Sequence, residues 1–168
     1  LSIRELIDEA SAPYRDRKVL LAVASKPSKT DDETNGLSAE PIGERQPGVV
    51  FGLGNLIENA VGYARERVDI TARWDKTTVQ VEIADDGPGF PADLMDSLGD
   101  PYVTTRGSGQ ANREAKAGGL GLGFFIAKTL LERSGATVEL DNKEAPMSGA
   151  IVRVGWLRTD YESNKARL

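Results

Sequence analysis

Apolar residues recur at helical spacing in several parts of the chain. Near its start, Ile3, Leu6, Ile7 and Ala10 lie three or four residues apart, and Pro13 ends the pattern. This spacing predicts a short amphipathic helix, because residues three and four apart lie on one helix face. Three further helices are predicted over residues 48–65, 91–98 and 120–134, of which the first is the longest.

Strand patterns fill much of the remaining chain. Val68–Trp74 and Thr77–Ala84 each alternate apolar and polar residues, and a short turn around Asp75 joins them. They predict a hairpin with one buried face. The continuous apolar run Val19–Ala24 predicts a buried strand. A last pair of strands is predicted over residues 137–142 and 150–156.

Three stretches show neither period. Residues 26–46 are polar and contain two prolines, which favours a long exposed loop or a loose hairpin. Residues 99–119 are rich in glycine and charge, so we expect a mobile loop there. Residues 158–168 are expected to form a polar tail.

The order of these elements predicts an α+β two-layer sandwich, in which helices cover one face of a mixed β-sheet. A chain of 168 residues that is 39% hydrophobic has room for one domain. We expect residues 15–157 to form that domain and residues 158–168 to follow as the tail. Residues 1–14 are expected to be its first helix or part of a connection to another domain. The chain begins with Leu1 rather than methionine, which suggests a piece of a longer protein.

Composition excludes several classes of function. The chain has 26 acidic and 21 basic residues, for a net charge of −5, which argues against nucleic acid as a partner because nucleic-acid surfaces need clustered positive charge. It has neither cysteine nor histidine, which excludes disulfides and argues against a zinc site. No apolar run approaches the roughly 20 residues that cross a bilayer. A nucleotide pocket remains compatible with this composition.

Two asparagines on the longest predicted helix form the first candidate site. Asn55 and Asn59 are four residues apart and share a face, which Gly52 and Gly62 extend. Each glycine costs roughly 1 kcal/mol relative to alanine in a helix interior, a cost that is understandable where a ligand must approach the backbone. A polar helix surface with small residues is the simpler alternative.

The second candidate is the motif DDGPGF, which places Asp85 and Asp86 between a predicted strand and a glycine turn. In one interpretation this is a surface turn, in which Asp85 caps the backbone while Gly87 and Gly89 adopt positive φ. In the other, Asp85 accepts hydrogen bonds from the amino group of an adenine. An ionised carboxylate only accepts, so it would repel the carbonyl that guanine carries at that position.

The third candidate is the run GGLGLG at residues 118–123, which leads into a predicted helix. Backbone N–H groups at such a helix start can bind phosphate. The run is not a Walker A motif, because no Gly-Lys-Ser/Thr follows. It is not a Rossmann fingerprint either, because no predicted strand leads directly into it.

In this order, NLIENA, DDGPG and GLGLG resemble the N, G1 and G2 boxes of the histidine-kinase ATP-binding domain. That domain has the Bergerat fold, which gyrase-type ATPases, the chaperone Hsp90 and MutL proteins share. Residues 100–106, DPYVTTR, resemble its F box, with Tyr102 where phenylalanine is usual. The resemblance covers about residues 47–156. The stretch GLGLGFFIAKTLLERSG is similar to the RegB/PrrB/ActS group of redox-responsive, membrane-anchored bacterial sensor kinases.

The resemblance implies a role for each motif. Asp85 would hold the adenine amino group, and Gly87 and Gly89 would let the backbone approach the ring. Tyr63 would line the base pocket, although it could equally be a core tyrosine. Asn59 would supply an oxygen to the Mg²⁺ that bridges the ATP phosphates, with Asn55 beside it. The backbone expected to face the phosphates is Gly119, Leu120, Gly121, Leu122 and Gly123, and the cations expected in the loop before it, the lid, are Arg106, Arg113 and Lys116.

Some positions depart from the family pattern. Many members carry a lysine where this chain has Gly62, and Ala117 replaces the first glycine of the usual G2 pattern, so lid cations are expected to meet the phosphate charge. Glu58 is rejected as a general base. In the gyrase-type relatives the activating glutamate corresponds to Asn55, and asparagine cannot take a proton, so hydrolysis of ATP by water should be poor.

The family transfers the γ-phosphoryl group to a histidine on a helical dimerisation domain, and this chain has no histidine. The resemblance therefore implies the ATP-binding catalytic domain of a two-component kinase, with its own dimerisation domain and a response regulator as partners. The full-length protein would be a homodimer anchored in the inner membrane, with this domain in the cytoplasm. Two alternatives stay open: a nucleotide-sensing module without phosphotransfer, and a gyrase-like or chaperone-like ATPase, which Asn55 disfavours.

Overall fold

The computed structural model describes residues 1–28, 38–91 and 122–162. Its five strands are β1 (Leu20–Pro27), β2 (Arg67–Trp74), β3 (Thr78–Asp85), β4 (Thr137–Asn142) and β5 (Ala150–Leu157). They form one sheet in the order β1-β2-β3-β5-β4, in which β1 is parallel to β2 and the other neighbours are antiparallel.

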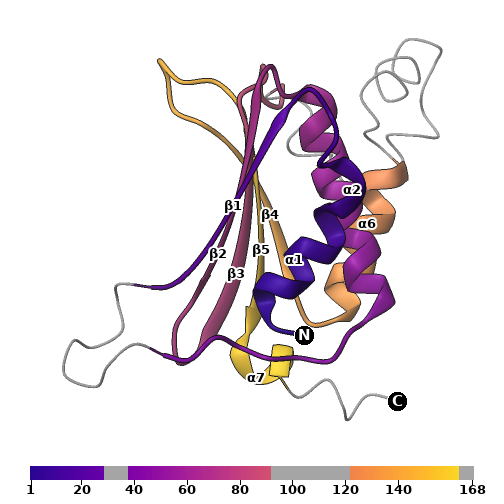
Figure 1. The fold of residues 1–168 in the computed structure, drawn as a ribbon, viewed down its shortest axis with the longest axis vertical. Helices are drawn as coiled ribbons and strands as arrows, with labels where there is room; N and C mark the ends of the chain where they lie inside the picture. Colours follow the sequence, from indigo (N-terminus) through magenta and orange to yellow (C-terminus); the bar gives the residue numbers. More distant parts are fainter. Residues whose placement is uncertain (29–37, 92–121, 163–168) are drawn as a thin grey trace.

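Helices form the second layer. They are α1 (Ile3–Ser11), α2 (Pro47–Tyr63) and α6 (Leu122–Arg133), and Figure 1 shows them against one face of the sheet. The predicted two-layer α+β sandwich with a mixed sheet is therefore confirmed. The core lies between the layers, where the apolar faces of both can be buried together.

The β2–β3 hairpin follows the alternating pattern of its sequence. Its inward residues are Val68, Ile70, Ala72 and Trp74 on β2 and Val79, Val81 and Ile83 on β3, all of them buried. Asp75 closes the hairpin, because its Oδ1 accepts hydrogen bonds from the backbone N–H groups of Thr77 and Thr78 at 2.8 and 2.7 Å. The predicted hairpin with one buried face is confirmed.

Helix α2 contacts both α1 and α6, and glycine allows its close approach to α6. A Cβ at Gly52 would lie 2.9 Å from Leu131 Cγ and 3.2 Å from the carbonyl oxygen of Ala127, both on α6. The prediction that Gly52 extends the polar face of α2 is therefore wrong, because this glycine is buried in a helix–helix contact. A Cβ at Gly62, by contrast, would meet nothing within 4 Å.

Helix α1 belongs to the core of this unit. Ser2 and Glu5 form a capping box at its N-terminus, and the residues predicted to form its apolar face, Ile3, Leu6, Ile7 and Ala10, are all buried. The helical pattern at the start of the chain is thus confirmed. Helix α1 packs on α2 rather than extending away from it.

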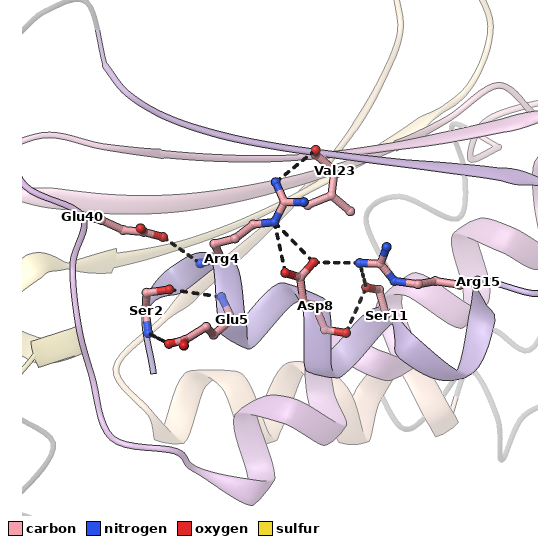
Figure 2. A network of polar contacts seen from close by, with 8 residues as sticks. All are labelled: Ser2, Arg4, Glu5, Asp8, Ser11, Arg15, Val23 and Glu40. Atoms are coloured by element: carbon pink, nitrogen blue, oxygen red, sulfur yellow. Dashed lines mark hydrogen bonds and ion pairs between the residues drawn. The ribbon is translucent and has the colours of Figure 1, made fainter.

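Strand β1 lies where it was predicted, but it is not a buried strand. Among the described residues it has a neighbouring strand, β2, on one side only, none of its own residues is fully buried, and Leu20 is 57% exposed. An apolar run cannot reveal that a strand lies at a sheet edge. Figure 2 shows a contact between α1 and this strand: Arg4 Nη1 donates to the carbonyl oxygen of Val23 at 3.3 Å, and Asp8 accepts from the same guanidinium.

Residues 158–162 form a short helix, α7 (Arg158–Glu162), so the predicted polar tail is wrong for this part. Tyr161 is buried and meets Trp156 edge-on, with ring centroids 5.5 Å apart. Arg158 donates to the carbonyl oxygen of Ala39 at 2.7 Å, and Trp74 Nε1 donates to that of Ser38 at 2.9 Å. These bonds hold residues 38–45, which form a loop as predicted, against the sheet end.

Two expectations lie outside the described residues: the short helix over 91–98, apart from its first residue, and the loop over 99–119. Within the described parts, the helices are too short or too polar to cross a membrane.

The two α2 glycines give a test of the helix packing. We expect Gly52→Val to lower the free energy of unfolding by about 1–3 kcal/mol, because the added atoms overlap Leu131 and the α6 backbone. Gly62→Val should change it by less than about 0.5 kcal/mol, since this site is open and the helix propensities of valine and glycine are similar. Urea unfolding of both variants measures the difference. Equal stabilities would show that close packing does not require Gly52.

Candidate functional site

The candidate site lies at the end of the sheet where β3 finishes. The register places Asp85 of β3 opposite Val68 of β2 on one side and next to the start of β5 on the other. The end of β4 lies beside that start, because Asn142 pairs with Ala150. Three strand ends and the turn after β3 therefore meet in one place.

Asp85 is buried at the centre of this arrangement, with 3% of its surface exposed. Its Oδ1 accepts hydrogen bonds from the backbone N–H groups of Gly87, at 2.9 Å, and Ala150, at 3.1 Å. Within the described parts of the chain, no hydrogen bond reaches its Oδ2. One carboxylate oxygen is thus fixed by the protein, and the other remains available to a donor.

The pKa of the Asp85 carboxyl reflects its burial at this strand end. Burial raises the pKa of its carboxyl above the ordinary value, because burial disfavours the charged form. The hydrogen bonds from Ala150 and Gly87 and the charge of Lys143 lower the pKa, but they do not cancel the effect of burial. The ionised form therefore lacks part of the stabilisation that water would give it.

Asp86, the next residue, has a different role. Its Oδ1 accepts a hydrogen bond from the backbone N–H of Arg65 at 2.7 Å, and its Oδ2 accepts one from Glu66 at 3.1 Å. Burial is the largest single influence on this carboxyl and raises its pKa, but the backbone donors together outweigh burial and the pKa lies below its usual value. Asp86 thus ties the turn to the connection between α2 and β2.

The glycines of the turn have packing partners within the protein. A Cβ at Gly87 would overlap the carbonyl oxygen of Tyr63 at the end of α2. Gly89 has the predicted positive φ, at 82°, and a Cβ there would lie 2.8 Å from Asn142 Oδ1. The positive φ predicted for Gly87 is wrong, and this glycine is required by its contact with Tyr63 instead. Close packing against α2 and β4 therefore requires glycine at both positions, whether or not a ligand approaches. Their proposed part in base binding stays a prediction.

The asparagines of α2 lie on a half-buried face. Asn55 and Asn59 both have intermediate exposure, and Glu58 beside them is exposed. Tyr63 is half-buried at the end of the helix, and burial raises the pKa of its hydroxyl. The structure therefore presents both amide side chains on one side of α2, as the spacing predicted, while leaving their contacts with a ligand untested.

The start of α6 is the last predicted part of the site that the structure describes. Leu122 is 54% exposed, and a Cβ at Gly123 would meet nothing within 4 Å, so the first turn of the helix is accessible. The other predicted phosphate-binding and lid residues, Arg106, Arg113, Lys116, Gly119, Leu120 and Gly121, lie outside the described residues.

Sequence reasoning missed the contribution of the β4–β5 hairpin. Ala150 donates to Asp85 from a position 65 residues away. Gly149, with a φ of 143°, lies so close that a Cβ there would overlap the Asp85 carbonyl oxygen. Asn142 makes two hydrogen bonds to Phe90, and Lys143 affects the pKa of Asp85. The only signal was a glycine just before a predicted strand, which fits many turns equally well.

The comparisons with known proteins agree with this geometry. Residues 45–160 match the family model described as histidine kinase-, DNA gyrase B- and HSP90-like ATPase. This match spans more than half of the chain, so the chain belongs to that family. The resemblance predicted from the three motifs is confirmed.

Among curated proteins, the sensor histidine kinase RegB of Cereibacter sphaeroides is 38% identical over 162 residues, covering 90% of this chain and 34% of RegB. The sensor protein KdpD of Escherichia coli is 31% identical over 102 residues, 60% of this chain and 10% of KdpD. This chain therefore spans about a third of RegB and a smaller part of KdpD.

Solved structures support the fold. The mycobacterial sensor histidine kinase MprB gives a TM-score of 0.67 at 16% identity, covering 94% of this chain and 95% of that one. The catalytic domain of the histidine kinase ThkA gives 0.65 at 22% identity, covering 94% and 95%. The α+β sandwich is thus that of histidine-kinase catalytic domains.

The two adjacent carboxylates give opposite expectations for stability against pH. The pKa of Asp85 is raised, so the stability it contributes is present below the unfolded value and is lost as the pH rises through the folded pKa. Asp85→Asn keeps an acceptor for Gly87 and Ala150 without the buried charge. Without nucleotide, this variant should match or exceed wild-type stability at pH 7, and the difference should shrink towards pH 4.

Asp86→Asn is the matched control. The pKa of Asp86 is lowered, so its contribution is present at neutral pH and is lost as the pH falls through the folded pKa. This variant should be less stable than wild type at pH 7, with the deficit fading in acid. Urea unfolding at several pH values compares the two. If Asp85→Asn were the less stable variant at every pH, burial would not govern the Asp85 carboxyl.

Proposed function

We propose that this chain is the ATP-binding catalytic domain of a two-component sensor histidine kinase. In this proposal it binds Mg²⁺–ATP and transfers the γ-phosphoryl group to a histidine outside the chain. The observation that carries the proposal is the buried Asp85 carboxylate, with Oδ1 held by two backbone donors and Oδ2 open to a third. The match to a family of histidine kinases and related ATPases supports the assignment.

The base-binding part rests on Asp85. An adenine amino group would donate to Oδ2 and supply the hydrogen bond that burial makes valuable. Guanine presents a carbonyl at the same position, which an ionised carboxylate would repel. Gly87 and Gly89 shape the turn beside the ring, and Tyr63 lies close to the turn, because Gly87 packs on its carbonyl oxygen.

The metal and phosphate part rests on Asn55 and Asn59. The described residues hold no cluster of three or more acidic or histidine side chains that could bind a metal ion alone. Mg²⁺ bound to nucleotides needs few protein ligands, because phosphate oxygens and water complete its octahedral shell. The amide oxygen of Asn59 suits such an ion, which would neutralise charge on the phosphates when bound. The first turn of α6, at Leu122 and Gly123, offers backbone N–H groups to phosphate oxygens.

The lack of a general base that could activate water on this face of α2 favours phosphoryl transfer over ATP hydrolysis. Neither Asn55 nor Asn59 can take a proton, Glu58 is exposed, and no other candidate for a base to activate water emerged on this face of α2. Positioning and charge neutralisation can instead serve transfer to a nitrogen nucleophile, in which the bond from Pγ to the bridging oxygen breaks, an N–P bond forms and ADP leaves. This chain has no histidine, so the nucleophile belongs to another domain.

The wider assignment follows the relatives. One solved structure is titled as the histidine kinase ThkA in complex with the response regulator protein TrrA, which supports a response regulator as the next partner here. Another is titled as full-length ShkA in complex with AMPPNP. The similarity to the sensor histidine kinase RegB supports a sensor kinase as the whole protein. We further propose that this protein is a membrane-anchored homodimer that responds to redox state, with this domain in the cytoplasm.

The nucleotide assignment predicts base selectivity. By calorimetry with Mg²⁺ present, the chain should bind ATP more tightly than GTP, and Asp85→Asn should weaken ATP binding by about 1.5–3 kcal/mol, the cost of losing a charged hydrogen bond. This is about 10- to 150-fold in Kd. Asn59→Ala should weaken binding mainly when Mg²⁺ is present. Asp86→Asn, whose carboxylate binds the backbone instead, should retain wild-type selectivity, and unchanged ATP affinity in Asp85→Asn would rule out the base assignment.

The transfer assignment predicts where label goes. With γ-labelled ATP, this chain alone should gain no acid-labile, base-stable phosphate, because it lacks histidine. Adding the histidine-containing dimerisation domain of a RegB-like kinase should produce label on that domain. Asp85→Asn should abolish it at low ATP concentration. Tight ATP binding with no transfer to any such domain would instead support a nucleotide-sensing module.

A further inference from the structure

The β4–β5 hairpin closes over the turn that follows β3. Ala150, the first residue of β5, donates to Asp85 at one end of the turn. Asn142, the last residue of β4, binds Phe90 at the other end. Asn142 and Ala150 are direct partners in the β4–β5 register, so a single pair of facing residues holds both ends of the turn.

The two bonds of Asn142 form a matched pair. Its Oδ1 accepts from the backbone N–H of Phe90 at 2.7 Å, and its Nδ2 donates to the carbonyl oxygen of Phe90 at 2.8 Å. The side-chain amide thus binds Phe90 as the backbone of an adjacent strand would. Such pairing requires a donor and an acceptor side by side in one planar group, which the carboxamide of asparagine provides without ionisation.

The same side chain limits the conformation of the turn. A Cβ at Gly89 would lie 2.8 Å from Asn142 Oδ1, so the turn and the amide are in close contact. The backbone of the β4–β5 hairpin also contacts this turn. Lys143 N–H donates to the Gly149 carbonyl at 2.9 Å, and Gly149 packs on the Asp85 carbonyl. Displacing Asn142 would therefore free the turn at Phe90 and loosen the hairpin around Asp85.

We propose that Asn142 is a positioning residue for nucleobase recognition: by holding Phe90 through both backbone groups, it fixes the turn that aims Asp85 Oδ2 at the base. This inference rests on the proposed binding of adenine nucleotide. It adds a residue from β4, outside the three sequence motifs, that acts on the base through Asp85 rather than by touching it. It also predicts that base selectivity and phosphate binding can be separated, because the bonds from Asn142 to Phe90 hold the turn, whereas the asparagines proposed for the metal and phosphates lie on α2.

The experiment compares Asn142→Ala, which removes both bonds, with Asn142→Asp, which keeps an acceptor for Phe90 N–H but loses the donor. Asp141→Asn is the matched control, since this neighbouring side chain is exposed, pairs with Arg153 of β5, and as asparagine keeps an acceptor for the backbone N–H of Asn142. Calorimetry measures ATP, GTP and inorganic tripolyphosphate, each with Mg²⁺. NMR measures exchange of the Phe90 and Gly87 amides and the titration of the Asp85 carboxyl without ligand.

We expect Asn142→Ala to raise the Kd for ATP about tenfold, the effect of roughly one hydrogen bond in position, and to reduce the preference for ATP over GTP. Tripolyphosphate should bind as it does to wild type. Asn142→Asp should show a change in the same direction, because its second carboxylate oxygen would face the Phe90 carbonyl oxygen without a proton between them. Asp141→Asn should show none. Exchange at Gly87 should quicken along with exchange at Phe90, because the whole turn is released.

A wild-type preference for ATP over GTP in both Asn142 variants would overturn the proposal, even if they unfolded more easily, because it would show a role in stability alone. If Asn142→Ala does not fold, Asn142→Asp decides by the same ratio. If the wild-type chain binds no ATP, the proposed function fails, and the positioning role is then judged by the Asp85 titration. In that case an Asp85 pKa unchanged in both variants would reject it.

Discussion

The arrangement of the site depends on burying one ionisable group, the Asp85 carboxyl, at the end of β3. Burial disfavours its charge and raises its pKa, so the protein must supply hydrogen bonds that hold the group in place. One donor, Gly87, lies two residues along the turn, and the other, Ala150, begins β5. The carboxyl is correctly placed only when both the turn and the β3–β5 register are formed. The strand register and the geometry of the site therefore both depend on the hydrogen bonds that hold the buried Asp85 carboxyl.

The glycines around this carboxyl follow from the same constraint. Gly87 packs on the end of α2, Gly89 on Asn142, and Gly149 on the carbonyl oxygen of Asp85 itself. Each marks a place where two backbone segments meet more closely than a side chain permits. The two explanations considered for DDGPGF are consequently compatible. Asp85 does cap its own turn through Gly87 N–H, and the cap leaves its second oxygen open to a base.

Helices α1, α2 and α6 and both hairpins were predictable, because one-sided burial produces a period of 3.6 or 2 in the sequence. The motifs likewise located Asp85. The exposed edge position of β1 was not predictable, since an apolar run is the same in either place, and α7 is too short for its one buried tyrosine to form a pattern. The parts of Ala150 and Asn142 depend on strand register between distant segments, which no local pattern encodes.

Asp85 and Asp86 show how a strand end separates stability from function. Asp85 is the last residue of β3 and Asp86 begins the bend that follows, so the two adjacent carboxylates have different surroundings. Asp86 satisfies backbone donors near the surface and has a lowered pKa, whereas Asp85 is buried with a raised one. The carboxylate proposed to bind the base is thus the one whose charge weakens the fold. An amino group that donates a hydrogen bond to Oδ2 would favour the charged form of Asp85. Nucleotide binding at this residue would therefore be thermodynamically linked to folding.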